Sequence, residues 1–136
     1  MKELLTKEIC KLVIEEGLKT GADFVEVFAE HTIANRIEMA NEKITKSTTN
    51  IIHGASVRIL NGSKEIFGYT NNHDLKSLLK LAKDLAAGIN ENPLGIEFEL
   101  EECSKNDVIN PIILPSTVTN DLKINYINEV NNSIRA

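Results

Sequence analysis

Ala55-Ser-Val-Arg-Ile-Leu60 and Ser63-Lys-Glu-Ile-Phe-Gly-Tyr-Thr70 flank the dipeptide Asn61-Gly62, and this stretch decides the fold. Apolar and polar residues alternate on both sides of the dipeptide, as they do in strands that bury one face. Both central positions of a type I′ turn need positive φ, which asparagine and glycine tolerate best. The stretch therefore predicts an antiparallel β-hairpin with Asn61-Gly62 as its two-residue loop.

Three segments before this hairpin also have a period of two. Val25–Ala29 and Ile33–Met39 alternate aliphatic with other residues, which predicts two antiparallel strands. Asn41-Glu42 is a plausible turn into Lys43–Asn50, whose threonines and serines indicate an exposed or edge strand. Together with the hairpin, these segments predict about five strands.

Amphipathic helices complete the predicted fold. The first is expected over Lys2–Lys19 and ends at Gly21, the second follows a cap at Asn72 or Asp74, and the third starts near Thr119. The apolar stripes that predict them are Leu5, Ile9, Leu12 and Val13, then Leu75, Leu78, Leu79, Ala82, Leu85, Ala86 and Ile89, then Leu122, Tyr126, Ile127, Val130 and Ile134. The sequence therefore predicts an α+β fold, a largely antiparallel β-sheet of about five strands packed with two to three α-helices.

Changes of composition along the chain predict its domain organisation. Residues 1–92 are expected to form one α+β domain, residues 93–118 an acidic extended linker segment, and residues 119–136 the start of a further helix. No glycine or proline ends that helix before Ala136. We therefore expect the natural protein to continue beyond this position.

Composition excludes several function classes. The chain has 136 residues, 42% of them hydrophobic, and a formal net charge of −5, so it has no basic surface for direct nucleic-acid binding. Its N-terminus has neither the apolar core of a signal peptide nor a membrane span of about 20 residues. Cys10 and Cys103 form no disulfide framework, which indicates a reduced protein. We expect a cytoplasmic protein that does not bind membranes.

His31, His53 and His73 are the candidate metal ligands, although none belongs to a short ligand pair such as H-x-x-x-H. They can still meet in space, but isolated histidines at strand ends are more often solvated or locally hydrogen-bonded. Cys10 lies beside the apolar stripe of the first helix, where a small buried hydrophobe is the ordinary interpretation, and Cys103 has no cysteine or histidine nearby in sequence.

The charged candidates also have ordinary interpretations. Alternating Glu97, Glu99 and Glu101, next to Glu102, predict a solvated acidic face more than a cation site, as do paired carboxylates such as Glu15-Glu16. Arg36 and Arg58 are expected to form cross-strand ion pairs. No glycine-rich phosphate loop is present, and with no tryptophan and 4% aromatic residues no stacking platform is predicted. We therefore assign no catalytic, cofactor-binding or metal-binding residue.

One block of the sequence resembles a known family. It consists of Gly21-Ala-Asp-Phe-Val-Glu-Val-Phe-Ala-Glu30, Ile44-Thr-Lys-Ser-Thr48, Gly54-Ala-Ser-Val-Arg-Ile-Leu60 with Asn61-Gly62, and Phe67-Gly-Tyr-Thr-Asn71 before the leucine- and alanine-rich helix. In this order and spacing the segments resemble the N-terminal domain of the TldD/PmbA family. The resemblance covers about residues 3–90.

The resemblance implies a function for the parent protein. Members of the family, also called modulators of DNA gyrase, are zinc metallopeptidases or their silent partners, and they degrade or process antitoxins and peptide-antibiotic precursors in the cytoplasm. Two TldD/PmbA-type subunits enclose a chamber, and an H-E-x-x-x-H motif with a distant cysteine holds zinc in the C-terminal domain. This chain lacks that motif. It is therefore expected to be inactive alone, with zinc in the C-terminal domain of the full-length protein, and to wall the chamber and contact a second subunit and the peptide substrate.

Two other classes of function remain open from the sequence. A non-catalytic peptide- or protein-binding module would use the acidic segment 97–102 to dock a basic partner. An independent hydrolase would use one of the three histidines with a bound metal.

Overall fold

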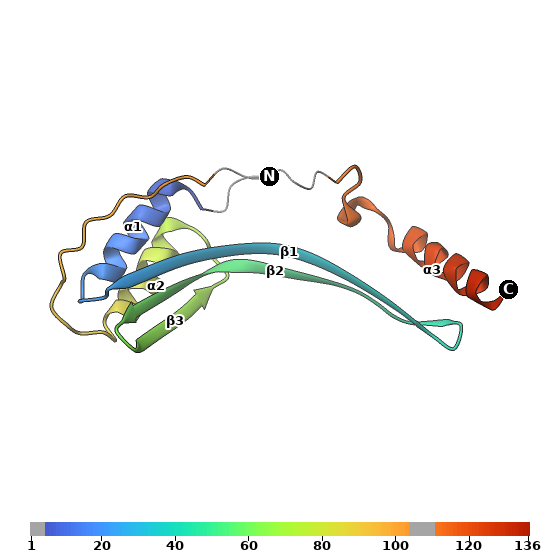
Figure 1. Ribbon diagram of the computed structural model, residues 1–136, viewed down its shortest axis with the longest axis horizontal. Coiled ribbons are helices and arrows are strands. Elements are labelled where there is room, and N and C mark those ends of the chain that lie inside the picture. The colour runs from blue at the N-terminus through green and yellow to red at the C-terminus, as the bar shows by residue number, and fades with distance from the viewer. Residues whose placement is uncertain (1–4, 104–110) are drawn as a thin grey trace. The chain divides into compact units, whose positions relative to one another are not determined.

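The computed structural model describes residues 5–103 and 111–136 and has an α+β fold (Figure 1). The elements in chain order are α1 (Lys7–Leu18), β1 (Phe24–Ala40), β2 (Lys43–Asn61), β3 (Lys64–Thr70), α2 (Leu75–Ala86), the short 3-10 helix η1 (Pro115–Thr117) and α3 (Asn120–Arg135). The predicted fold class is confirmed.

The described residues form a three-stranded sheet with the order β1-β2-β3, in which β2 and β3 are antiparallel. The prediction of about five strands is therefore wrong. Residues 24–40 and 43–61 each form one long strand where the sequence predicted two. No glycine or proline interrupts Glu30-His-Thr32, so nothing in that segment ends the first strand.

The β2–β3 hairpin is confirmed, but its turn is displaced by one residue. Asn61 pairs with Lys64 and so belongs to the sheet, which leaves Gly62-Ser63 as the loop. Gly62 has a φ of 57°, whereas Asn61 does not have a positive φ. Two hydrogen bonds fix this corner: the Asn61 side-chain amide donates to the Gly21 carbonyl over 2.7 Å, and the Asp23 carboxylate accepts from the Gly62 N–H over 2.7 Å. A side chain engaged in this way keeps Asn61 extended.

The described chain comprises two compact units, of which the first contains residues 5–31 and 53–103. Helices α1 and α2 lie on the same side of its sheet (Figure 1). They contact each other, and α2 also contacts β3. The buried core of this unit comprises Val13, Ala22, Val25, Ala55, Val57, Ile59, Leu78, Ala82, Ala86 and Ile89. Removing these side chains from water is the main favourable term in the stability of the unit.

Side-chain caps set the start of each helix. The Thr6 hydroxyl accepts from the Ile9 N–H over 3.2 Å, so α1 begins at Lys7 and not at Lys2 as the sequence suggested. Residues 2–4 of the predicted helix lie outside the described residues. Asp74 caps α2, and Thr119 caps α3, as predicted.

The second unit contains residues 32–52 and 111–136 of the described chain. Asn41 and Glu42, with φ values of 49° and 65°, form the predicted turn from β1 to β2. An ion pair joins Glu42 to Arg135 near the end of α3. None of the described side chains of this unit is fully buried. The unit therefore depends on partly buried contacts.

Within the predicted linker, residues 93–103 form no helix or strand, and Pro115–Thr117 form the 3-10 helix η1. Phe98 and Leu100 are half-buried, whereas Glu97, Glu99 and Glu101 are exposed, which agrees with a solvated acidic face. Phe98, Glu99 and Leu100 line a small hollow together with Lys7 and Lys11 of α1. No helix in the described part of the chain is long and apolar enough to cross a membrane.

Candidate functional site

The three histidines do meet in space, within the first unit. The Nδ1 atoms of His31 on β1 and His53 on β2 lie 3.1 Å apart, and their ring centroids are 5.1 Å apart. The ring of His73, just before α2, lies 4.9 Å from that of His53 in an edge-to-face arrangement. The His73 Nδ1 atom is buried and has no hydrogen-bond partner. His53 thus occupies the middle of a row of three imidazoles.

This histidine row does not have the geometry of a metal centre. Among residues 5–103 and 111–136, no group of three or more histidine, cysteine or carboxylate side chains is arranged to hold a metal ion. The sequence also contains no H-E-x-x-x-H motif. The described residues therefore do not fit a zinc site.

The other residues singled out in the sequence have structural roles. Arg58 donates to Glu26 on the neighbouring strand, with its Nε 2.8 Å from the carboxylate, and lies 3.9 Å from Glu65. The predicted cross-strand pairing of Arg58 is confirmed. The ion-pair partner of Arg36 is Glu38, which lies on the same strand.

The two cysteines form no disulfide. Cys10 on α1 is half-buried, in agreement with a packing role, and Cys103 is exposed.

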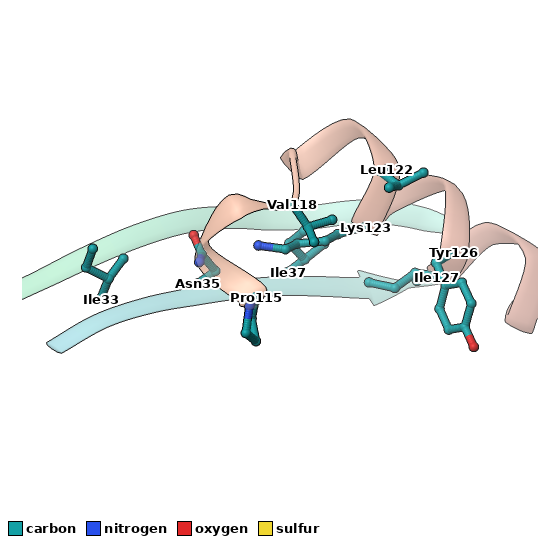
Figure 2. Close-up of a pocket in the computed structure, with 9 residues that line it drawn as sticks. All are labelled: Ile33, Asn35, Ile37, Pro115, Val118, Leu122, Lys123, Tyr126 and Ile127. Atoms are coloured by element: carbon teal, nitrogen blue, oxygen red, sulfur yellow. The ribbon is translucent and has the colours of Figure 1, made fainter. Parts of the chain in front are cut away.

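An apolar groove runs along the second unit (Figure 2). Its volume is about 510 Å³, within the range of about 300–1,000 Å³ that is typical of ligand pockets. The hairpin contributes Ile33, Asn35 and Ile37, and the C-terminal segment contributes Pro115, Val118, Leu122, Lys123, Tyr126 and Ile127. Sequence reasoning missed this groove, because the apolar stripe predicts the last helix but does not show which residues of the hairpin lie opposite it.

One edge of β2 is available for strand addition. β3 pairs with residues 55–61 of β2, so residues 43–54 have no strand of the described chain on that side. Unpaired backbone N–H and C=O groups at such an edge can pair with an extended peptide. This observation agrees with the edge character that the threonine- and serine-rich sequence predicted for residues 43–50.

A second feature that sequence reasoning missed lies on the sheet face that points away from α1 and α2, here called the outer face. It comprises Phe24, Glu26, Phe28 and Glu30 of β1, Ser56, Arg58 and Leu60 of β2, and Glu65, Phe67 and Tyr69 of β3. Strand alternation contained the signal: the aromatic residues of β1 occupy the positions between the core residues Val25, Val27 and Ala29. The low aromatic content of the chain therefore did not reveal this surface, because most of the aromatic residues gather on one face of the sheet.

Comparison with protein families gives one match. Residues 25–88 match the family described as PmbA/TldA metallopeptidase domain 1. The matched segment contains nearly all of β1, the whole of β2 and β3, and helix α2. No curated protein matches the chain.

Proposed function

The chain belongs to the PmbA/TldD metallopeptidase family through its first domain, and from this premise we propose that it forms the peptide-admitting wall of such an enzyme. In this proposal the catalytic zinc belongs to another domain of the parent protein. The domain described here helps to admit peptides to the chamber and contributes contacts to a second subunit. The family match of residues 25–88 is the observation that carries the proposal.

The free edge of β2 supports a role in peptide admission. Its residues 43–54 present backbone donors and acceptors, which recognise extended peptides through their main chain and so tolerate different sequences. The apolar groove along the same hairpin adds a place for apolar side chains of a substrate. A peptidase that processes unfolded substrates needs recognition of this kind.

The exposed face of α3 supports the proposed contact with a second subunit. Leu122, Tyr126, Val130 and Ile134 recur every four residues and are all exposed, and Val130 and Ile134 are not among the residues that line the groove. Apolar residues at this spacing form one stripe on a helix, and such stripes commonly pack against a partner.

Two changes to the full-length parent test the proposal. Deleting residues 1–90 is expected to abolish or deregulate peptide cleavage. A sharper variant replaces residues 33–50 with Asn-Gly, which trims the hairpin but keeps every residue of the buried core. We expect this hairpin-trimmed parent to retain its zinc and to lose at least about tenfold in kcat/KM for an unfolded peptide.

The matched control is Lys80→Ala, which removes one exposed ion pair with Asp84 on α2 and is expected to leave cleavage unchanged. Normal cleavage by both the deleted and the trimmed parents would contradict the proposal.

A non-catalytic binding module is the second candidate function, and the aromatic outer face favours it. The coding sequence after Ala136 separates the two candidates. An H-E-x-x-x-H motif there supports the peptidase, and a long continuation without it supports a silent partner subunit. A stop codon at that position supports the stand-alone module.

A further inference from the structure

The outer face carries most of the aromatic side chains of the chain and leaves them in contact with water. The sequence contains four phenylalanines and two tyrosines. Four of these six, Phe24, Phe28, Phe67 and Tyr69, lie on the outer face and are 44%, 53%, 59% and 74% exposed. Exposed clusters of this kind mark interaction surfaces, and aromatic residues and arginine are the side chains that dominate binding energy at interfaces.

The outer face belongs to a rigid scaffold. Val25, Val57 and Ile59, which alternate with its residues along β1 and β2, are buried in the core. The aromatic side chains therefore keep their spacing without a partner. A surface organised in advance loses less conformational entropy on binding.

Charge on the outer face selects the kind of partner. It carries the carboxylates of Glu26, Glu30 and Glu65 and a single guanidinium, that of Arg58. Arg58 lies at the centre, paired with Glu26 and more loosely with Glu65, and its guanidinium is 5.8 Å from the ring centre of Phe24. The formal charge of the face is thus −2, in a chain whose net charge is −5.

This charge argues against three other occupants. Nucleic acids and anionic lipid surfaces require a positive surface. A second copy of the chain would place the same carboxylates against each other, which is unfavourable. A partner that presents cations around apolar groups fits the surface better, because its cations meet the excess carboxylates while its apolar groups cover the aromatic rings.

We propose that the outer face binds an extended peptide segment whose apolar side chains are flanked by lysine or arginine. Two strand spacings make the face about 10 Å wide, so an extended chain crossing it places about three residues over it. Alternation along the peptide directs its apolar side chains to the rings between β1 and β3. The flanking cations pair with carboxylates at the rim. This inference rests on the proposed function, since it names the class of peptide that the domain holds.

The absence of tryptophan from the chain permits a direct test. In the 136-residue chain, the Phe67→Trp variant places a fluorescent reporter on the outer face, and Lys80→Trp places a control reporter on α2, on the other side of the sheet. The probe is a ten-residue peptide that alternates lysine with phenylalanine and valine. We expect it to shift the fluorescence of the Phe67→Trp variant saturably and to leave that of the Lys80→Trp variant unchanged.

Two control peptides test the chemistry. One replaces every lysine with glutamate, and the other replaces every apolar residue with serine. Both are expected to bind at least about tenfold more weakly than the probe. Removing one strongly contributing side chain from an interface weakens binding by a similar factor. Affinity for the lysine peptide is also expected to fall as salt concentration rises.

Two substitutions test the residues of the face. Tyr69→Ser removes the most exposed ring and is expected to weaken binding about tenfold, as truncation of an interface aromatic does. Glu65→Lys is expected to reduce the preference for the lysine peptide over the glutamate peptide. Both side chains are exposed, so neither change removes a core contact. Circular dichroism of each variant confirms that it is folded.

Equal affinity for the lysine and glutamate peptides would overturn the proposal, as would no fluorescence change in the Phe67→Trp variant at about 1 mM lysine peptide. Self-association that shields the tryptophan of the Phe67→Trp variant would assign the outer face to a second copy of the chain, and this result would also overturn the proposal. The outcome is separate from that of the proposed function. If peptide binding fails while the hairpin-trimmed parent loses cleavage, only the inference about the outer face is wrong.

Discussion

His31 and His53, which are 22 positions apart in sequence, approach each other through their Nδ1 atoms at 3.1 Å. A hydrogen bond between two neutral imidazoles requires a proton on one Nδ1 and a lone pair on the other. Such a hydrogen bond therefore requires different tautomers in the two rings. The contact joins β1 to β2 at the end of the helix-covered sheet, and His73 extends it to the segment before α2.

The first prediction concerns these tautomers. When both rings are neutral, we expect one of His31 and His53 to carry its proton on Nδ1 and the other on Nε2. Nitrogen-15 NMR of the imidazole rings distinguishes the two forms. His31→Ala should leave His53 in the Nε2–H form, whichever ring donates, and lower the free energy of unfolding by about 1 kcal/mol, the typical net contribution of one hydrogen bond. Finding both rings in the Nε2–H form in the unmodified chain would refute the prediction.

The convergence of the histidines shows a limit of sequence reasoning. Alternation predicts which side chains share a strand face, but it does not give the register between β1 and β2 or the path of the chain after β3. Those long-range pairings place His53 between His31 and His73. Sequence reasoning could only allow that the three histidines meet.

The wrong prediction of the number of strands has a different cause, and the sequence already held the pattern that would have corrected it. Core-facing and groove-lining residues of β1, such as Val25, Ala29, Ile33 and Ile37, all occupy odd positions. A turn between two strands would normally move the inward-facing residues from odd to even positions, whereas one continuous strand keeps them at odd positions. The helices were easier to predict, because polar caps such as Asp74 mark their starts locally.

The second prediction concerns Gly17 in the last turn of α1. A Cβ added there would lie 2.8 Å and 2.9 Å from the two methyl groups of Val25 and 3.4 Å from Ile59. Alanine normally stabilises a helix interior by about 0.5–1 kcal/mol relative to glycine, but overpacking a core costs about 1–3 kcal/mol. Gly17→Ala is therefore expected to destabilise the chain by about 1 kcal/mol net and to lower Tm by about 4–8 °C.

A double-mutant cycle checks the cause. In a Val25→Ala background the conflicting methyl groups are absent, so adding Gly17→Ala should be neutral or stabilising. Chemical denaturation of the four variants measures the coupling. Simple additivity of the two changes would mean that the contact with Val25 is not responsible.

The third prediction concerns the cap of α2. The Ser77 hydroxyl donates to Asp74 over 2.7 Å and the Ser77 N–H donates over 3.0 Å, and these hydrogen bonds hold the pKa of Asp74 below its ordinary value of 3.8. Because the folded state binds this proton less tightly than the unfolded state, the carboxylate stabilises the fold at pH values above 3.8. That contribution disappears as the pH falls through the lowered pKa of the folded state. Thermal stability should therefore decrease with acidification in this range.

Ser77→Ala removes the hydrogen bond with the largest effect on Asp74, so the pKa of this carboxyl should rise toward its ordinary value. Carbon-13 NMR titration of the side-chain carboxyl measures the change directly. Ser133→Ala is the matched control, because Ser133 also donates within a helix but its acceptor is the backbone carbonyl of Glu129 on α3. An unchanged pKa of Asp74 in Ser77→Ala would mean that the backbone N–H alone sets it. In that case the acid sensitivity of the cap would persist in the variant, since the N–H of residue 77 remains available to the carboxylate.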